Sequence, residues 1–311
     1  MAFLRGLGAY LPARIIGNQP LAEALGVTPE WIYEVSGIEE RRYSGVGETV
    51  TSMGVAAAED CLRRANAKPE EIGMVIVASG SSERRFPGPA CRVAAELGIG
   101  GVPAIDLPMA SAGSLFGLSL ASSLVEKYGN ILVTGSEKMS PIVQHEPLDR
   151  NVDILFGDGA GACLVSGDRG QAKLLDSLIQ SDGAFAEDLK LEFGKPLEMN
   201  GRSVIMQASR KVPRVISQLL ERNQIAPADV EVFLMHQANQ NLIDRVAKGI
   251  GVLPTKFYSN IAHYGNTSSA SLLIAASEWW SATGGPKPGV PVCFAAFGAG
   301  FHWGAALAVG T

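Results

Sequence analysis

Short apolar runs with no polar face recur along this chain and limit the folds open to it. They are rich in β-branched residues and bounded by Gly, Ser or Pro, and they comprise Met74–Ala78, Ile131–Thr134, Ala162–Val165, Val232–Leu234 and Val292–Ala296. Strands that are buried on both faces have this pattern, because helices cover both sides of their sheet. We therefore expect a largely buried sheet with helices packed on it.

Helical patterns lie between these runs, as such a sheet requires. Apolar residues repeat at helical spacing in two clear stripes, Val212, Val215, Ile216, Leu219 and Leu220, and Leu242, Ile243, Val246, Ala247 and Ile250. The 36 glycines also fit many tight turns and close contacts between helices and a sheet. The alternation of strands and helices predicts the α/β fold class.

Two pairs of segments, half a chain apart, share a pattern. Residues 71–76 and 229–234 both begin with an acidic residue and continue as an apolar strand. Residues 106–119 and 260–273 both open with a polar residue and a loop and continue as a helix of small residues. The repeat predicts two similar halves, residues 1–167 and 168–311, related by a pseudo-twofold axis. Equivalent loops would then meet at the centre and bring Ser111 and Asn266 together.

Ser111 precedes a helix that is apolar or small on every face, over residues 111–125. Such a helix is predicted to be buried, and its Gly and Ser residues fit close packing of two helices. A helix N-terminus carries partial positive charge and unpaired N–H groups, which suit an anionic nucleophile or an oxyanion. Ser111 is therefore either a nucleophile or, as Ser often is, a plain N-cap.

Two further polar residues also follow apolar, strand-like stretches. They are His236, in the run Met-His-Gln-Ala-Asn, and Asn266, in the run Tyr-Gly-Asn-Thr-Ser. Polar groups at three strand exits predict one site, in which His236 takes the proton of Ser111 and Asn266 holds the imidazole or donates to an oxygen. Taken alone, His236 would be a structural residue and Asn266 a turn residue.

Charge and hydropathy argue against two classes of protein. The chain has 26 Lys and Arg against 31 Asp and Glu, a net charge of −5, and no dense basic run, so nucleic acid is not an expected partner. No stretch reaches the roughly 18 consecutive apolar residues of a membrane-spanning helix, and the N-terminus lacks the pattern of a secretory signal. We expect neither membrane spanning nor secretion.

Cysteine and histidine spacing bears on redox state and metals. The cysteines are widely spread without C-x-x-C spacing, at Cys61, Cys91, Cys163 and Cys293. They are predicted to be reduced thiols of a cytoplasmic protein, not disulfides or zinc ligands. His145, His263 and His302 show no ligand spacing with carboxylates or cysteines, so no metal site is expected.

Several short motifs occur together over nearly the whole chain. They are Trp31 to Tyr43 with Ser-Gly-Ile-Glu-Glu-Arg, Glu48 to Gly54, Phe86-Pro87, Asp106 to Gly113, Phe156 to Ala162 with Gly-Asp-Gly-Ala-Gly, His236 to Asn239, Gly265 to Ser268, and Phe297 to Phe301. With these motifs the chain resembles β-ketoacyl-acyl carrier protein synthase III, a condensing enzyme of the thiolase superfamily. The resemblance implies a thiolase-like five-layer α-β-α-β-α fold made of two similar halves, and a homodimer.

The resemblance also implies an acyl-enzyme mechanism with a Cys-His-Asn set. His236 and Asn266 match two members of the set, and Ser111 falls on the cysteine. In the family, the His and Asn also stabilise the enolate that forms when a malonyl thioester loses carbon dioxide. The expected oxyanion donors are the backbone N–H groups of Ser111 and Ala299, and Ala299 stands where the family usually has glycine.

Binding residues follow from the same resemblance. Trp31 would flank the adenine of coenzyme A, Arg150 would meet its phosphates, and Asn239 would lie along the pantetheine channel. Phe86 would reach into the acyl pocket of the partner subunit, which Ile142 and Phe156 would line. Two positions depart from the family, since Val35 and Asn241 stand where it typically has arginines.

We therefore expect an acyltransferase that moves an acyl group from an acyl thioester, on coenzyme A or a carrier protein, through Ser111 to a malonyl-type thioester. Three alternatives stay open from the sequence. They are acyl transfer to an alcohol or amine, a non-catalytic subunit of a condensing complex, and an engineered replacement of cysteine by Ser111 that traps a substrate. No cofactor is expected beyond the thioester substrate.

Overall fold

The structure, a computed structural model, describes residues 1–144, 146 and 148–311, so the prediction about His145 lies outside the described residues. A ten-stranded sheet runs through the molecule in the order β12-β11-β13-β14-β8-β1-β7-β6-β4-β5. Its strands are β1 (Ala2–Tyr10), β4 (Ile72–Ala78), β5 (Ala104–Leu107), β6 (Asn130–Glu137), β7 (Gly159–Ser166), β8 (Ala172–Ser181), β11 (Phe233–Met235), β12 (Phe257–Tyr258), β13 (Pro291–Gly298) and β14 (His302–Gly310). Each predicted strand lies within or overlaps one of these.

The sheet consists of two halves with the same strand order, β5-β4-β6-β7-β1 and β12-β11-β13-β14-β8. In each half the first three strands are parallel and the last two are antiparallel to their neighbours. The halves join where β1 pairs with β8. Strands β4 and β11 hold equivalent places, as the sequence repeat predicts, whereas the domain boundary at residues 167 and 168 stays a prediction.

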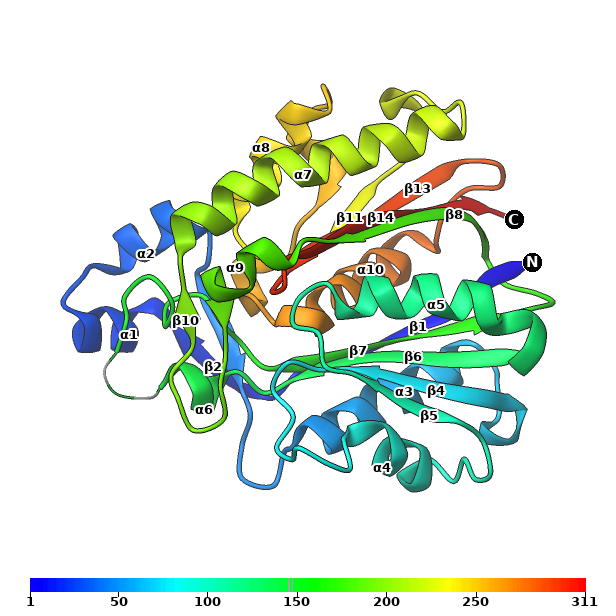
Figure 1. Ribbon diagram of the computed structural model, residues 1–311, viewed down its shortest axis with the longest axis horizontal. Helices are drawn as coiled ribbons and strands as arrows, with labels where there is room; N and C mark the ends of the chain where they lie inside the picture. The colour runs from blue at the N-terminus through cyan, green and yellow to red at the C-terminus, as the bar shows by residue number, and fades with distance from the viewer. Residues whose placement is uncertain (145, 147) are drawn as a thin grey trace.

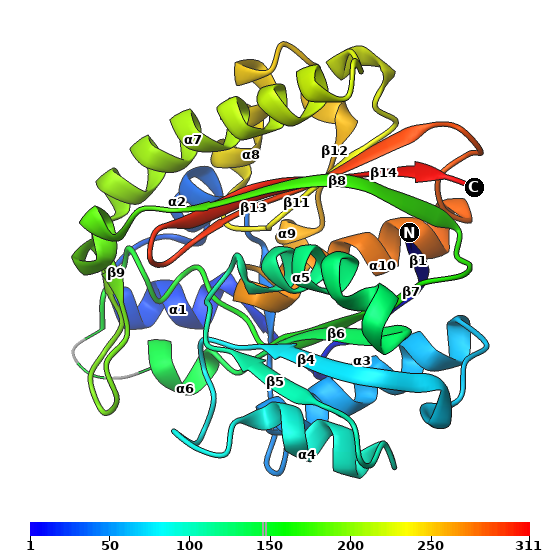
Figure 2. The same ribbon diagram turned by 45° about the vertical axis from the view of Figure 1, so that its right-hand side comes forward.

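Helices form three layers with the two half-sheets between them (Figures 1 and 2). The helices concerned are α3 (Val50–Arg64), α4 (Pro89–Glu96), α5 (Gly113–Tyr128), α7 (Gly201–Arg222), α8 (Gln240–Gly249) and α10 (Ser271–Thr283). Helices α3 and α4 cover the first half-sheet, α7 and α8 cover the second, and α5 and α10 lie between the halves. This is the five-layer α-β-α-β-α fold that the family resemblance implies.

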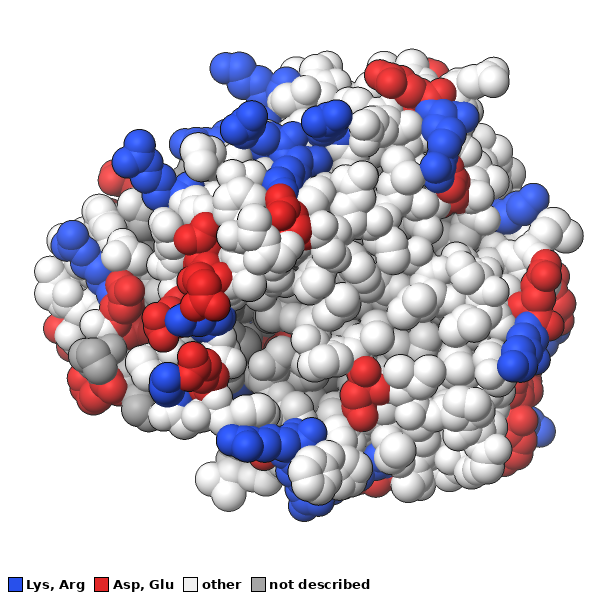
Figure 3. All heavy atoms as spheres, in the orientation of Figure 1, with Lys and Arg blue, Asp and Glu red and all other residues white. Residues whose placement is uncertain are grey.

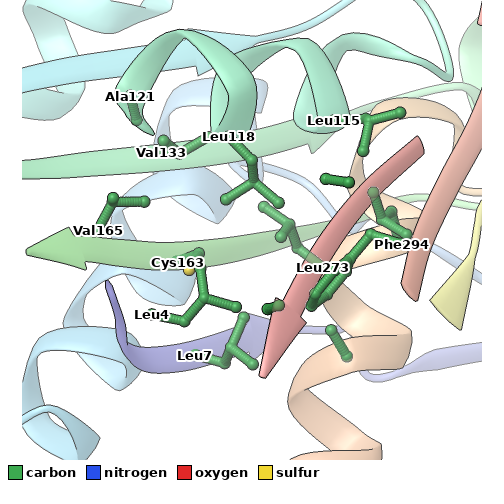
Figure 4. Packing of buried hydrophobic residues seen from close by; sticks show 14 of the residues in the cluster. Leu4, Leu7, Leu115, Leu118, Ala121, Val133, Cys163, Val165, Leu273 and Phe294 are labelled. Atoms are coloured by element: carbon green, nitrogen blue, oxygen red, sulfur yellow. The ribbon is translucent and has the colours of Figure 1, made fainter. Parts of the chain in front are cut away.

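The two central helices can lie deep in the protein because small residues let them approach the strands. A Cβ on Gly117 of α5 would lie 2.7 Å from Cγ1 of Val133, and one on Gly161 of β7 would lie 2.6 Å from Cβ of Leu273. Figure 4 shows Leu118 and Leu273, from the two helices, packed in one buried cluster. The apolar helix predicted from residue 111 is thus buried, and its N-terminal end is fixed at the centre of the molecule.

A smaller layer stands beside the ends of the half-sheets. It contains β2 (Arg14–Gly17), α1 (Asn18–Leu25), α2 (Pro29–Ser36), β3 (Glu40–Tyr43), α6 (Ser140–Val143), β9 (Leu189–Lys190) and β10 (Glu198–Met199). The buried guanidinium of Arg41 ties part of it together by donating to Asn18 Oδ1 at 2.8 Å and to the carbonyl of Ile154 at 2.7 Å. Within the described ranges, no helix has the length and apolar character that crossing a bilayer requires.

Candidate active site

A cavity of about 490 Å³ brings together the three residues predicted to react. Ser111, His236 and Asn266 all line it. Ser111 precedes α5 in the first half, and the other two come from the second half, so the cavity lies where the halves meet. The structure thus places a hydroxyl, an imidazole and a carboxamide in one site, while their catalytic roles stay predictions.

Ser111 lies in the turn between β5 and α5, and its backbone is left-handed with a φ of 65°. Few residues other than glycine adopt this conformation, and such strain concentrates at functional sites. The N-cap of α5 is Ala112, so the interpretation of Ser111 as a plain N-cap is wrong. Its backbone N–H, the predicted oxyanion donor, donates to Ser268 Oγ at 3.0 Å, so an acyl oxygen would have to replace that hydroxyl.

The end of β13 holds the Ser111 turn from the other side. A Cβ on Gly298 would lie 2.2 Å from the carbonyl oxygen of Ala110 and 2.8 Å from the backbone nitrogen of Ala112, so only glycine fits there. Gly298 lines the cavity, and Ala299, the second predicted oxyanion donor, follows it in the tight turn to β14. From the sequence, Gly298 was identified only as part of the Phe297 to Phe301 motif, although its Gly-Ala-Gly run is typical of a close backbone approach.

His236 directly follows β11 and is buried. Its Nδ1 lies 2.5 Å from Ser271 Oγ, which also accepts the N–H of Gln237 at 3.1 Å. Desolvation lowers the pKa of the His236 imidazole to about 3, against the smaller opposing effect of a hydrogen bond with the Ser268 backbone. The imidazole is therefore neutral near pH 7, and its partner is a hydroxyl instead of a carboxylate.

Asn266 is fixed through its backbone and its side chain. Its N–H donates to the carbonyl of Leu155 at 2.8 Å, and its carbonyl accepts from Gly157 at 3.1 Å. Oδ1 accepts the N–H of Ser268 at 2.9 Å, which leaves the NH₂ group of the carboxamide as the donor at the cavity. The prediction that Asn266 directly follows a strand is wrong, because helix α9 (Ile261–Tyr264) lies between β12 and this residue.

Two serines that the sequence analysis missed support these groups. Ser268 accepts the Ser111 N–H, and Ser271 contacts the His236 ring. Both belong to a run of small polar residues at the start of an otherwise apolar helix. Buried hydroxyls need hydrogen-bond partners. Serines at the start of an apolar helix are therefore a sequence signal that could have identified Ser268 and Ser271 as supporting residues.

The residues predicted to bind the thioester arm partly surround the same cavity. Trp31 and Asn239 line it, and so does Phe156, which was predicted for the acyl pocket. The guanidinium of Arg150 lies 5.8 Å from the centre of the Trp31 ring, beside the cavity wall. Asn239 also donates to the carbonyl of Val35 at 2.7 Å, which ties α8 to the end of α2.

The two positions that depart from the family, Val35 and Asn241, lie close to Asn239 and are both uncharged. Val35 lines the cavity, and the exposed Asn241 donates to the carbonyl of Glu34 at 3.1 Å. The wall formed by the end of α2 and the start of α8 is therefore held by amide hydrogen bonds. Neither residue offers a cation to a phosphate there.

Phe86 and Ile142, predicted for the acyl pocket, lie away from the cavity. Ile142 packs beside the cluster that contains Phe156 and lines a separate groove of about 1080 Å³, so its role in an acyl pocket stays a prediction. Its helix, α6, starts after Met139 and turns Ile142 toward that groove. Phe86 is 85% exposed in the segment before α4.

Metal-binding residues are not gathered anywhere in residues 1–144, 146 and 148–311. No group of three or more His, Cys, Asp or Glu side chains is placed there to hold an ion. The polar residues that line the cavity are Ser111, His236 and Asn266, together with Asn151, Arg202 and Asn239. This donor set can bind and polarise a carbonyl oxygen by hydrogen bonds.

Sequence comparisons match this chain to one family. Residues 105–183 match the family described as 3-oxoacyl-[acyl-carrier-protein (ACP)] synthase III, and residues 220–309 match its C-terminal part. The chain is 36% identical over 304 residues to β-ketoacyl-[acyl-carrier-protein] synthase III of Aquifex aeolicus, with 97% of each protein covered.

Solved structures give the same result. The crystal structure of 3-oxoacyl-[acyl-carrier-protein] synthase III from Aquifex aeolicus is similar with a TM-score of 0.94 and 35% identity, covering 99% of this chain and 100% of that one. The synthase III of Thermus thermophilus is similar with a TM-score of 0.93 and 31% identity, covering 99% of each chain. The similarity extends over both halves of the fold.

Proposed function

Because this chain belongs to the 3-oxoacyl-[acyl-carrier-protein] synthase III family of acyl-transferring condensing enzymes, we propose that it forms an acyl ester on Ser111 and condenses it with a malonyl-type thioester. The observation that carries the proposal is that Ser111, His236 and Asn266 share one cavity. Transfer to an alcohol or amine and a non-catalytic role are not favoured, since the relatives are condensing enzymes.

In the first step, the Ser111 hydroxyl attacks the carbonyl carbon of the acyl thioester. The O–H proton passes to Nε2 of His236, the carbon–sulfur bond breaks, and the thiol leaves with that proton. The acyl oxygen is proposed to bind the N–H groups of Ser111 and Ala299 during the transfer. A base with a pKa of about 3 takes this proton weakly, so we expect acylation to be slow.

In the second step, a malonyl thioester loses carbon dioxide and its carbonyl oxygen takes up the enolate charge. Nε2–H of the neutral His236 and the free NH₂ of Asn266 supply donors for that oxygen. The enolate carbon then attacks the ester carbonyl, a carbon–carbon bond forms as the carbon–oxygen bond to Ser111 breaks, and the Ser111 oxygen takes up a proton from water. The geometry supports this step more directly than the first, because a neutral imidazole can donate without first being protonated.

The hydroxyl partner of His236 suits both steps. In the first step Nε2 must be free to accept a proton, so Nδ1 carries the hydrogen and donates to Ser271 Oγ. In the second step Nε2 donates, so Nδ1 accepts from the Ser271 hydroxyl. A hydroxyl can play both parts, whereas a carboxylate only accepts and would hold one tautomer.

The acyl donor is proposed to be a thioester of a carrier protein or of coenzyme A. Trp31, Arg150 and Asn239 are the proposed contacts for its nucleotide and pantetheine parts. Figure 3 shows Lys and Arg side chains gathered over the part of the molecule where α7 runs. Arg202 of α7 is exposed and lines the cavity, which supports delivery of the acyl group by an acidic carrier.

We also propose a homodimer in a reducing compartment, the cytoplasm. Phe86 and Phe193 are strongly exposed beside the groove that Ile142 lines, and a second copy would cover them. All four cysteines are free, which fits a reducing compartment. The proposed chemistry needs no resident cofactor, because the thioester arrives activated and carbon dioxide loss drives the condensation.

The test measures the two steps separately by mass spectrometry. Wild-type protein is incubated with short acyl thioesters and digested, and an ester adduct of acyl mass is expected on the peptide that contains Ser111. Carbon dioxide release from a malonyl thioester is followed in parallel, with His236→Ala and Asn266→Ala as variants that should slow it. Absence of the adduct together with undiminished release by both variants would overturn the proposal.

A further inference from the structure

A buried carboxylate that the proposed chemistry does not use lies behind the cavity. Glu137, the last residue of β6, is fully buried. Gly80, two residues after β4, donates its backbone N–H to both carboxylate oxygens, at 3.0 and 3.1 Å. The hydroxyls of Ser79 and Ser81 donate to Oε2. These donors are neutral, and they tie one side of the carboxylate to the first half of the fold.

The other side of the carboxylate holds Ser269. Its backbone N–H donates to Oε1 of Glu137 at 3.2 Å, and its hydroxyl donates to the same oxygen at 2.7 Å. The carbonyl of Ser269 accepts from the hydroxyl of Ser114 on α5. A Cβ on Gly135 would lie 2.5 Å from that carbonyl oxygen, so the strand below is in direct contact as well. Ser269 is therefore fixed through all of its polar groups.

Ser269 stands in the middle of the segment that carries or contacts every reacting group. Asn266 begins this segment and presents its carboxamide to the cavity. Ser268, directly before Ser269, accepts the N–H of Ser111. Ser271, two residues after it, contacts Nδ1 of His236. A shift of Ser269 would thus be passed to the hydroxyl, the imidazole and the carboxamide together.

We propose that Glu137 is a positioning residue that sets the geometry of this active site through Ser269. The inference rests on the proposed function for the roles of Ser111, His236 and Asn266, but the contacts of Glu137 stand independently of it. The carboxylate spans the two halves of the fold at the level of the cavity and fixes the 266–271 segment against β4 and β6. It touches neither substrate nor reacting atoms.

The charge state of the side chain matters because its neighbours are donors. A carboxylate accepts at both oxygens, whereas a glutamine of the same shape places an NH₂ group either on the Oε1 side, facing Ser269, or on the Oε2 side, facing the hydroxyls of Ser79 and Ser81. In the first case the N–H and hydroxyl of Ser269 lose their acceptor and the segment moves away from the new donor, and in the second case the two buried hydroxyls beside Gly80 lose theirs. Because a misplacement of about 1 Å costs up to about 100-fold in rate, we expect Glu137→Gln to lower kcat by about 10- to 100-fold with KM nearly unchanged.

The experiment compares Glu137→Gln with Asp60→Asn in the full-length protein. Asp60 also accepts a backbone N–H, that of Ala9 at 3.2 Å, but it lies on α3 outside these contacts, so it controls for loss of a carboxylate. Carbon dioxide release from a malonyl thioester gives kcat and KM for the folded protein well below each melting temperature. The ¹⁵N chemical shifts of the His236 ring report its hydrogen bond with Ser271 and require no turnover.

A lowered kcat with unchanged KM and shifted His236 resonances in Glu137→Gln, but not in Asp60→Asn, supports the proposal. Unchanged kcat and unchanged resonances in folded Glu137→Gln overturn it, even if the protein melts earlier. If wild type releases no carbon dioxide while the resonances still shift, the proposed function fails and the positioning role stands. If Glu137→Gln does not fold, Glu137→Asp, too short to span both sides, is measured instead and judged by the same two readouts.

Discussion

Replacement of Ser111 by cysteine tests whether the site activates a nucleophile by its helix or by its imidazole. Ser111 lies two residues before α5, a helix of 16 residues, and the His236 beside it in the cavity is neutral. A thiol in Ser111→Cys would therefore be stabilised as thiolate by the helix N-terminus but not by an imidazolium. The two mechanisms predict very different thiol pKa values.

The expected value follows from the magnitude of each effect. A helix N-terminus contributes up to about 2 kcal/mol, which equals about 1.5 pKa units and would lower a thiol pKa from about 8.5 to about 7. Burial of the position opposes this effect, since Ser111 is only 7% exposed. We expect a thiol pKa between about 7 and about 8.5, whereas a thiolate paired with an imidazolium reaches about 4.

The pKa is read from the rate of alkylation by iodoacetamide between pH 4 and pH 10, followed by intact mass. Wild type provides the control, because it reports alkylation of the exposed Cys91 alone. In the same protein, acyl transfer from a thioester should be much faster than in wild type. An apparent thiol pKa near 4 would refute the reasoning, because it would require a charged His236 in the free enzyme.

Three further outcomes follow from the structure. Gly298→Ala places a methyl group 2.2 Å from the carbonyl oxygen of Ala110, so thermal unfolding should show that the free energy of unfolding falls by about 1 to 3 kcal/mol. Mass spectrometry should also show slower acylation of Ser111 in this variant. His236 stays neutral in the folded protein down to about pH 3 while the unfolded chain binds its proton below about pH 6.5, so stability is lost as the pH falls. Between about pH 7 and about pH 5, the free energy of unfolding measured in urea should therefore fall by about 2 kcal/mol more in wild type than in His236→Gln. Equal decreases in the two proteins would contradict the low pKa of His236. Phe86→Asp should give a folded monomer in sedimentation velocity, whereas an unchanged dimer would exclude this face as the interface.

The architecture could be predicted from the sequence because its strands are buried on both faces. Residues 74–78 and 162–165 have no polar face, and the structure places both in the interior of the sheet. The repeat of residues 71–76 in residues 229–234 likewise gave the equivalent places of β4 and β11. These signals are local in the sequence, and burial of strands and helices alone explains them.

The sequence could also predict that Ser111 and Asn266 lie close together, but it could not predict the burial and hydrogen bonding of the site. The duplication implied that the loops near Ser111 and Asn266 meet, and both line the cavity. The pKa of His236 depends on burial by residues distant in sequence, and the engagement of the Ser111 N–H depends on the conformation of Ser268. Which of two neighbouring hollows the Ile142 side chain faces depends on the short helix α6, and the sequence alone did not show it.

In the proposed mechanism, a neutral His236 imidazole would let the site keep the decarboxylation step even though the nucleophile is a hydroxyl. Decarboxylation needs donors for an enolate oxygen, and in the proposed mechanism His236 and Asn266 supply them whatever residue occupies position 111. Acylation needs a deprotonated nucleophile, and neither the helix N-terminus nor an imidazole with a pKa of about 3 ionises a hydroxyl readily. The rates of the two steps should therefore separate in this chain, with carbon dioxide release outpacing acyl transfer. A cysteine at position 111 would bring the two rates together by speeding acyl transfer alone.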